Sequence, residues 1–544
     1  MKTTTTTLLF LLFSVSLFAQ INQEWATTYT SPFNDGIDIA NSIALDNEGN
    51  VYITGQCMIN GINQDYATIK YNSVGVEQWV ATYNGPGNDE DVAVSIAVDE
   101  EGGIYVTGYS EGEGTGLDYA TIKYNSDGEE QWVARYASSS NSSNDRAVGL
   151  VLDTDGNIIV TGTGTGTGTG ANYITIKYNP VGQEQWIAYY NGTYSDVPKA
   201  ITVDALGNIY VTGMSNGSGT NSNYVTVKYS SSGATLWEAT YDGQGTYGDE
   251  PTDIAVDING NVYVTGNSWG NSSSGDIATV KYNSQGVEQW SMRYDGSIGE
   301  ADFASALAVD MYENVYVTGA SYITEDLKVF ITIKYDSNGV EMWIALYDDT
   351  VYWAGANAIT LDNDGNIYVT GTSYQEAGIG RVYTTVKYNT VGVEQWAAIY
   401  NPGNNDDLNN VASSIAVDVD GNVFITGKIS SPTTYLDMAT VKYSQPTGTD
   451  EVSSETQDKY YLSQNFPNPF SLTTTIHYTM QNPGFASLKV YDVTGKIVGQ
   501  LVNARQPAGD HQVQFDATGL PAGIYYYQLR VGKQSQTKKM ILIK

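Results

Sequence analysis

The chain has 544 residues and a formal net charge of −35. So acidic a protein repels the phosphates of nucleic acids and of anionic lipids, which argues against both as partners. Only 16% of the residues are charged and 12% are aromatic, so the chain is not a disordered acidic tail, and its length allows more than one domain.

The N-terminus has the pattern of a secretory signal peptide. Lys2 precedes an apolar run over residues 8–13, and Ala19 offers a small residue at the expected cleavage point. We expect residues 1–19 to be removed, and no later segment is long and apolar enough to span a membrane. The single cysteine, Cys57, excludes an intramolecular disulfide, and we expect a monomer.

One strand-like motif recurs eight times along the chain. The copy at Asn261–Gly266 reads Asn-Val-Tyr-Val-Thr-Gly, and its valines would face one way and its tyrosine and threonine the other. Both faces therefore carry residues that favour burial in a sheet. The copies end at Gly55, Gly108, Gly162, Gly213, Gly266, Gly319, Gly371 and Gly427. A period of about 53 residues built from short strands indicates a β-propeller.

Each repeat contains four predicted strands. In one copy they are residues 95–99, 103–108, 120–124 and 130–136, joined by tight turns. The chain begins with a copy of the fourth strand and its last repeat ends after the third. Because an unpaired edge strand is unfavourable, we predict that residues 22–29 lie beside residues 437–443 and close a ring of eight blades over residues 20–443.

Two details of the repeat carry further expectations. A tryptophan recurs in every fourth strand, at positions 25, 79, 132, 186, 237, 290, 343 and 396, and we interpret these residues as packing residues. The turn Asp310–Asn314 lacks the glycine that the other copies have, so we expect that hairpin to differ.

The composition changes after the last repeat. Residues 444–459 are polar without apolar periodicity, which indicates a linker. From Tyr460 onward, basic residues outnumber acidic ones, and strand-like runs follow one another closely. We predict a small β-sandwich over residues 460–544, so that the whole chain is all-β.

The repeat resembles the bacterial beta-propeller repeat family. The resemblance rests on Asp-x-x-Gly-Asn-Val-Tyr-Val-Thr-Gly, on Tyr-Ala-Thr-Ile-Lys-Tyr-Asn-Ser-x-Gly and on Glu-Gln-Trp, and it covers residues 22–443. It implies the propeller fold and no single activity.

The C-terminal region resembles the type A sorting domain of the type IX secretion system. The matching blocks are residues 464–470, 490–495, 520–525 and 538–544, in the order typical of that domain. The resemblance implies that residues 460–544 engage the type IX secretion machinery. It also implies a secreted or outer-membrane-surface location.

Residue usage limits the chemistry of the propeller. The propeller region contains no histidine and one cysteine, which argues against His-assisted Ser or Cys catalysis and against a His-rich zinc or copper site. Carboxylate pairs remain possible, so a hydrolase or lyase acting on polysaccharide is one alternative function. The acidic residues are too many for the sequence to single out a catalytic pair.

A second acidic residue recurs eight positions before each strand-ending aspartate in six blades. These residues are Asp38, Asp91, Asp145, Asp196, Asp249 and Asp302; the other two blades have Ala354 and Asn410. The six carboxylates could ring the central channel and bind calcium. The alternative is that each accepts hydrogen bonds from backbone N–H groups of its own loop.

A binding site should break the eightfold symmetry, and one sector of the loops does so. Residues of the fifth to seventh blades that depart from the repeat are Trp269, Tyr322, Lys328, Tyr352, Trp353, Tyr374 and Arg381. Aromatic platforms bind sugar rings and anchor protein partners. We therefore predict a non-enzymatic binding module for extracellular glycan or protein; a structural or adhesion component of the cell surface is the remaining alternative.

Overall fold

The structure is a computed structural model. It describes residues 21–32, 36–59, 61, 63–138, 143–165, 170–192, 194–216, 221–243, 247–270, 274–296, 298–347, 353–375, 380–402, 409–430, 435–445, 460–463, 465, 467–468, 470–480, 484–492, 496–531 and 534–543. The predicted signal peptide lies outside these residues, as does the predicted linker apart from Ser444, which ends the last strand of the propeller, and Gln445. The chain forms two compact units, Met1–Pro446 and Thr447–Lys544.

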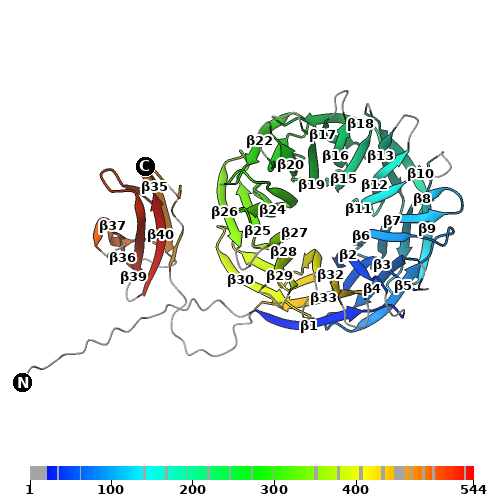
Figure 1. The fold of residues 1–544 in the computed structure, drawn as a ribbon, viewed down its shortest axis with the longest axis horizontal. Coiled ribbons are helices and arrows are strands. Elements are labelled where there is room, and N and C mark those ends of the chain that lie inside the picture. The colour runs from blue at the N-terminus through cyan, green and yellow to red at the C-terminus, as the bar shows by residue number, and fades with distance from the viewer. Residues whose placement is uncertain are drawn as a thin grey trace, which may run out of the picture. The chain divides into compact units, whose positions relative to one another are not determined.

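The first unit is a ring of eight β-sheet blades, as far as the described residues show (Figure 1). The inner strands are β2 (Ile39–Leu45), β6 (Asp91–Val98), β11 (Arg146–Leu152), β15 (Asp196–Val203), β19 (Asp249–Val256), β23 (Phe303–Val309), β27 (Ala354–Leu361) and β31 (Val411–Val417). The second strands carry the recurrent motif and are β3 (Val51–Cys57), β7 (Ile104–Gly112), β12 (Ile158–Thr165), β16 (Ile209–Asn216), β20 (Val262–Trp269), β24 (Val315–Tyr322), β28 (Ile367–Tyr374) and β32 (Val423–Ser430).

The remaining strands complete each antiparallel blade from the inside outward. The third strands are β4 (Asp65–Tyr71), β8 (Gly116–Tyr124), β13 (Ala171–Tyr178), β17 (Ser222–Tyr229), β21 (Gly275–Tyr282), β25 (Lys328–Tyr335), β29 (Arg381–Tyr388) and β33 (Leu436–Ser444). The outer strands of blades 1 to 7 are β5 (Glu77–Tyr83), β9 (Glu130–Tyr136), β14 (Glu184–Tyr190), β18 (Thr235–Tyr241), β22 (Glu288–Tyr294), β26 (Glu341–Tyr347) and β30 (Glu394–Tyr400). A two-residue strand, β10 (Ser143–Asn144), pairs in parallel with β8.

Strand β1 (Asn22–Tyr29) supplies the outer strand of blade 8. It pairs antiparallel with β33, from Asn22↔Ser444 to Tyr29↔Met438, and the sheet order of this blade is β1-β33-β32-β31. The predicted pairing of the first and last strands is confirmed, and with it the eight-bladed propeller. The ring is joined here by strand pairing between the two ends of the repeat region (Figure 1).

The motif strands form the core between blades. In β20, Val262, Tyr263, Val264 and Thr265 are all fully buried, so both faces of the strand pack against protein. The Tyr263 hydroxyl donates to Asp257 Oδ2 at 2.9 Å, and Asp257 Oδ1 accepts the N–H of the turn residue Asn259. The strand-ending aspartate therefore organises the turn and orients the buried tyrosine at once.

The eight recurrent tryptophans link neighbouring blades. Trp79 of blade 1 has its ring centroid 6.1 Å from Tyr52 of its own blade and 6.3 Å from Tyr124 of blade 2. Its Nε1 donates to the carbonyl of Ser126, also in blade 2, at 3.0 Å. Similar contacts recur around the ring, although Trp25 packs on Phe424 of its own blade and Trp396 donates to the Gln445 side chain, which confirms that these residues serve packing.

The hairpin that lacks its glycine does not differ from the others, so that expectation was wrong. Glu313 takes the place of the turn glycine and adopts its left-handed backbone, with φ 64°. The turn keeps its hydrogen bond from Glu313 N to Asp310 O, at 3.0 Å. The Glu313 carboxylate contacts Lys281 Nζ at 3.2 Å, an ion pair that offsets part of the backbone strain.

The second unit is a small β-sandwich around one hydrophobic core. One sheet contains β34 (Tyr460–Leu462), β35 (Thr473–Met480) and β38 (Gly509–Asp516); the other contains β36 (Gly484–Asp492), β37 (Ile497–Gln506), β39 (Gly523–Val531) and β40 (Gln534–Leu542). Its core includes Leu462, Ile476, Leu488, Phe515 and Tyr527. Among the residues described here, no helix has the length and apolar character needed to cross a membrane.

Candidate functional site

The six aspartates predicted to ring the channel are buried at the junctions between blades, each no more than 1% exposed. Each accepts a hydrogen bond from a backbone N–H of the loop that enters its blade. The donor N–H groups belong to Ser31 for Asp38, Gly85 for Asp91, Ser138 for Asp145, Gly192 for Asp196, Gly243 for Asp249 and Gly296 for Asp302, at 2.6 to 2.8 Å. These contacts agree with the alternative to a calcium site, in which each carboxylate accepts hydrogen bonds from backbone N–H groups of its own loop.

Burial shifts the pKa of several of these carboxyls. Desolvation raises the pKa of Asp38, Asp91, Asp249 and Asp302, while backbone hydrogen bonds to the ionised form act in the opposite direction. Asp65, which adjoins Asp91 at the junction of blades 1 and 2, is 2% exposed and has its pKa raised to about 6 by burial and by the charge of Asp91. Calcium binding by these residues stays a prediction.

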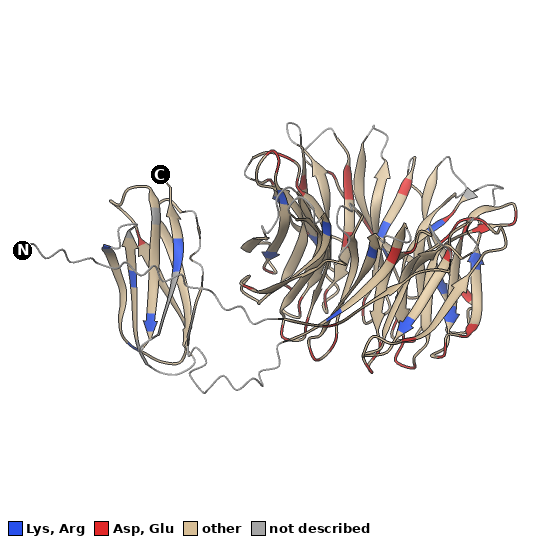
Figure 2. Ribbon diagram, turned by 60° about the horizontal axis from the view of Figure 1, so that its bottom comes forward, with Lys and Arg blue, Asp and Glu red and all other residues tan. Residues whose placement is uncertain are grey.

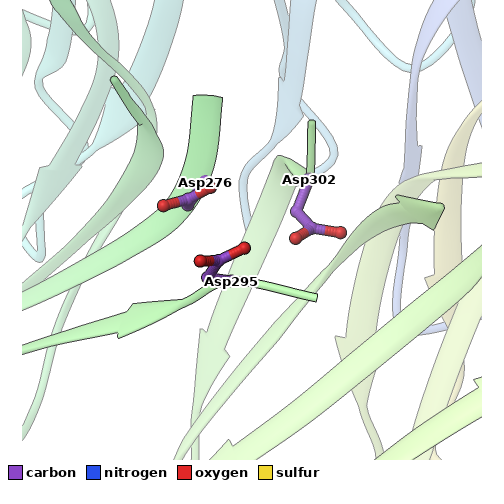
Figure 3. A group of neighbouring side chains, drawn as sticks. All are labelled: Asp276, Asp295 and Asp302. Carbon is purple, nitrogen blue, oxygen red and sulfur yellow. The ribbon is translucent and has the colours of Figure 1, made fainter. Parts of the chain in front are cut away.

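One junction gathers three carboxylates (Figure 3). Asp276, Asp295 and Asp302 each place one oxygen within 4.8 Å of the others; Asp295 is exposed and the other two are buried. Asp276 Oδ2 is paired with Arg293 Nε at 2.6 Å, and burial raises the pKa of both Asp276 and Asp302. Carboxylate oxygens at such separations suit a calcium ion or an acid–base pair.

The junctions of blades 6 to 8 depart from this acidic pattern. In the third strand, Val329 and Val382 take the place that Asp276 has in blade 5. At the start of the inner strand, Ala354 and Asn410 replace the aspartate. Immediately before the two valines the chain carries the cations Lys328 and Arg381.

The predicted loop residues of these blades come together around Trp353. We define the Trp353 cluster as Phe303, Tyr322, Lys328, Trp353, Tyr374 and Arg381. Lys328 Nζ lies 5.4 Å from the centroid of the Trp353 ring, 4.5 Å from that of Phe303 and 5.7 Å from that of Tyr322. Arg381 Cζ lies 5.1 Å from the centroid of the same indole. Two cations therefore share one tryptophan, in a geometry that favours cation–π attraction.

The backbone holds Trp353 in this position. Trp353 forms a parallel β-bridge with Lys328, and its carbonyl accepts the N–H of Tyr374 at 2.7 Å. In blade 1, the N–H equivalent to that of Tyr374 belongs to Met58 and donates to the carboxylate of Asp38. Blades 2 and 4 form the same backbone bond beside their aspartates, from Glu111 N to Glu90 O and from Asn216 N to Ser195 O. Blade 7 therefore keeps a backbone bond that does not need the carboxylate, and this bond holds the Trp353 backbone in place.

Neither cation has an acidic partner among the described residues. The ion pairs there include neither Lys328 nor Arg381, although acidic residues are spread over the blades (Figure 2). Glu325 and Asp326, the closest described acids in the sequence, are exposed. Burial lowers the pKa of Lys328, with no neighbouring acid to raise it again. Among the described residues, the cluster thus brings two positive charges together on an acidic protein.

Trp269 and Tyr352 complete the predicted set. Trp269, Tyr322 and Tyr374 occupy the same register position in successive blades, opposite Gly275, Lys328 and Arg381. The Trp269 indole covers Gly275 and is not one of the rings that lie near Lys328 or Arg381. Tyr352 lies outside the described residues.

The sequence did not point to Phe303, Asp276 or Asp295. Phe303 follows Asp302 at the start of an inner strand, where it is indistinguishable from a core residue. Asp276 could have been found, because Asp65, Asp118 and Asp437 stand at the same position in other blades.

Two protein families match parts of the chain. Residues 464–544 match the family described as secretion system C-terminal sorting domain. Residues 24–56, 78–114, 185–219 and 239–272 match the family described as beta-propeller repeat. Both resemblances inferred from the sequence motifs are therefore confirmed.

Individual relatives are distant. An uncharacterized WD repeat-containing protein of Acanthamoeba polyphaga mimivirus is 24% identical over 428 residues, which is 64% of this chain and 29% of that protein, so the chain spans less than a third of its length. Among solved structures, PorZ, a surface component of the type IX secretion system of Porphyromonas gingivalis, is 16% identical, with a TM-score of 0.37. The aligned region covers 91% of this chain and 68% of the PorZ chain. A ulvan lyase is 12% identical and covers 76% of this chain and 95% of its own, also with a TM-score of 0.37.

The confirmed features agree on where the protein goes. The repeats account for the ring of blades, and the C-terminal β-sandwich coincides with the matched sorting domain. A sorting domain links its cargo to the secretion machinery, which carries the cargo to the cell surface or into the medium. The chain is an eight-bladed β-propeller with four segments that match the beta-propeller repeat, followed by a type IX secretion sorting domain, and it is secreted or displayed at the cell surface.

Proposed function

We propose that this protein is a non-enzymatic extracellular binding module, and that its ligand, a glycan or a protein, binds at the Trp353 cluster. The observation that carries the proposal is the break in symmetry at blades 6 to 8. There a tryptophan, two tyrosines and two cations, which form no ion pair among the described residues, stand where most other blades have small, polar or aliphatic residues. Residues that recur in every blade stabilise the ring, so residues that occur once are available for recognition.

The exposure of the cluster supports binding from solvent. Tyr322, Lys328, Trp353, Tyr374 and Arg381 are all half-buried, which leaves part of each side chain accessible. Half-buried aromatic and arginine side chains are the residue types that dominate binding energy at interfaces. The indole is held by backbone contacts, so little ordering is required when a ligand binds.

A binding screen of the full secreted chain against glycans and surface proteins tests the proposal. Trp353→Ala should weaken binding to the ligand that the screen identifies by about tenfold or more, since central aromatic residues of interfaces typically contribute over 1 kcal/mol. Tyr194→Ala is the matched control, because Tyr194 is an exposed aromatic in the equivalent loop before blade 4. Equal losses for the two variants, or none for Trp353→Ala, would show that the ligand binds elsewhere.

A carboxylate-dependent hydrolase or lyase acting on polysaccharide is the second candidate. It is favoured by the group Asp276, Asp295 and Asp302, in which an exposed carboxylate lies near two whose pKa is raised. Asp295→Asn separates the two functions. It would abolish product release by an enzyme and leave binding at the Trp353 cluster unchanged. Binding to neither glycan nor protein would favour the third candidate, a structural or adhesion component.

A further inference from the structure

We propose that the Trp353 cluster recognises an acidic polysaccharide, with Lys328 and Arg381 contacting the carboxylate or sulfate groups of its sugars. This inference rests on the proposed function and adds the chemical class of the ligand. It starts from a contrast between junctions. Where blades 1, 2, 5 and 8 place Asp65, Asp118, Asp276 and Asp437 in the third strand, blades 6 and 7 place valines preceded by the two cations.

Two half-buried arginines at other junctions have acidic partners. Arg135 pairs with Asp118 at 2.9 Å and Arg293 pairs with Asp276 at 2.6 Å. Among the residues that the structure describes, Lys328 and Arg381 form no ion pair, and aromatic rings lie near their charged groups. Aromatic rings hold a cation without neutralising it, so the positive charge remains available to an anion.

An anion would bind here despite the net charge of the chain. At physiological ionic strength, charges are screened over about 8 Å, so an anion at the rim responds mainly to the two adjacent cations. Both cations lie within 5.4 Å of the centroid of one indole, close enough to act on one acidic residue of a ligand or on two successive ones. A guanidinium binds carboxylate and sulfate through paired hydrogen bonds, and an ammonium adds a point charge.

The arrangement of the rim favours a saccharide polymer over an acidic peptide. Trp269, Tyr322 and Tyr374 stand at one register position of three successive blades, and in blades 6 and 7 the opposing residue is a cation. A repeated pair of aromatic ring and cation fits a chain in which sugar rings and acidic groups also repeat. Aromatic faces contact the apolar face of a pyranose, which an acidic peptide does not present.

The test measures binding of the full secreted chain to four polymers. These are polygalacturonate, dextran sulfate, neutral dextran and poly-L-glutamate. We expect one of the two acidic polysaccharides to bind at least tenfold more tightly than dextran and poly-L-glutamate. We also expect this binding to weaken as salt rises. Lys328→Met with Arg381→Met keeps the aliphatic packing against the rings and removes both charges, and it should weaken acidic polysaccharide binding at least tenfold with a smaller salt dependence.

Arg146→Met is the matched control for loss of charge. Arg146 lies on the other side of the ring, with its Cζ 4.5 Å from the centroid of Tyr109, and its removal should change Kd less than twofold. Arg381→Lys keeps the charge and loses the paired hydrogen bonds, so its Kd should lie between those of the wild type and the double variant.

Several outcomes overturn the inference, and they can be told apart. Tighter binding of poly-L-glutamate would identify an acidic peptide as the ligand. Binding of dextran alone, lost in Trp353→Ala and unchanged in the double variant, would leave the proposed function standing and refute the acidic class. Absence of binding to these four polymers, combined with a negative screen of glycans and surface proteins, would refute both. An equal loss in Arg146→Met would show a general charge effect.

Discussion

Closure of the ring makes Trp25 the most informative tryptophan to remove. Trp25 belongs to β1, and its Nε1 donates to the carbonyl of Ser73 in blade 1 at 3.2 Å. Its ring centroid lies 6.4 Å from Tyr71 of blade 1 and 6.2 Å from Phe424 of blade 8. Each of the other seven recurrent tryptophans lies on an outer strand that a tight turn joins to the third strand of its own blade. β1 has no such turn, so strand pairing with β33 attaches it to blade 8.

The expected cost follows from these contacts. Replacing a fully buried tryptophan by alanine costs about 3–5 kcal/mol. Because Trp25 is half-buried, we expect Trp25→Ala to lower the free energy of opening β1 by about 2–3 kcal/mol, of which about 1 kcal/mol is the hydrogen bond. The Ser73 carbonyl also accepts Lys442 Nζ, at 3.1 Å, so it does not lose every partner. Trp25→Phe should therefore cost only about 1 kcal/mol.

Native-state hydrogen exchange measures this opening directly. A loss of 2–3 kcal/mol corresponds to exchange about 30- to 150-fold faster for the amides of β1 and for those of β33 that bond to it. The control is Trp237→Ala in blade 4, which loses a like hydrogen bond, to Ser284, and like ring contacts. If Trp25→Ala accelerates exchange in β1 and β33 no more than Trp237→Ala does, closure does not depend on this residue.

Two further predictions concern the scaffold. Asp65→Asn should stabilise the protein by up to about 3 kcal/mol at pH 8 and not at pH 4, because a carboxyl whose folded pKa is raised to about 6 lowers stability as pH rises from about 4 to 6. Blade 3 has Asn172 at this position, which shows that the site accepts an amide. Equal urea midpoints for the variant and the wild type at pH 8 would contradict the prediction. Gly260→Ala should cost about 1 kcal/mol in denaturant titrations, because Gly260 has φ 77° and an added Cβ meets nothing closer than 3.4 Å. A loss above 3 kcal/mol would indicate a packing clash instead of backbone strain.

The fold could be predicted because its evidence repeats. One copy of Asn261–Gly266 indicates only a buried strand, whereas eight copies fix the period, and the offset between the first and last strands predicts which two segments must pair. The same reasoning failed at Asp310–Asn314. There we expected a missing glycine to change the hairpin, but Glu313 accepts a left-handed backbone whose cost of about 1–2 kcal/mol is small beside the strand pairing around it.

The candidate site was less accessible to sequence reasoning. Lys328, Trp353 and Arg381 stood out because they depart from the repeat, but their shared contact depends on how two loops from different blades meet. The regular spacing of the six aspartates does not predict the direction of their side chains. A carboxylate that faces the channel and one that faces the N–H groups of its loop differ only in the side-chain rotamer. Phe303 gave no signal, because an apolar residue in an inner strand is ordinary.

The junctions of blades 6 to 8 explain how a symmetric ring can acquire one binding site. At the other junctions a buried aspartate ties the loop to the next blade, and replacing it would leave backbone N–H groups without an acceptor. Blade 7 replaces the aspartate with Ala354 and keeps the backbone bond from Tyr374 N to the Trp353 carbonyl, at 2.7 Å, which blades 2 and 4 also form at the equivalent position. Blade 8 keeps the acceptor as Asn410, whose Oδ1 accepts the N–H of Ser430 at 2.8 Å and whose Nδ2 donates to the Arg381 carbonyl at 2.7 Å. Both blades therefore lose a negative charge and still form these hydrogen bonds, and among the described residues the two cations beside them have no ion pair, so an acidic ligand can supply one.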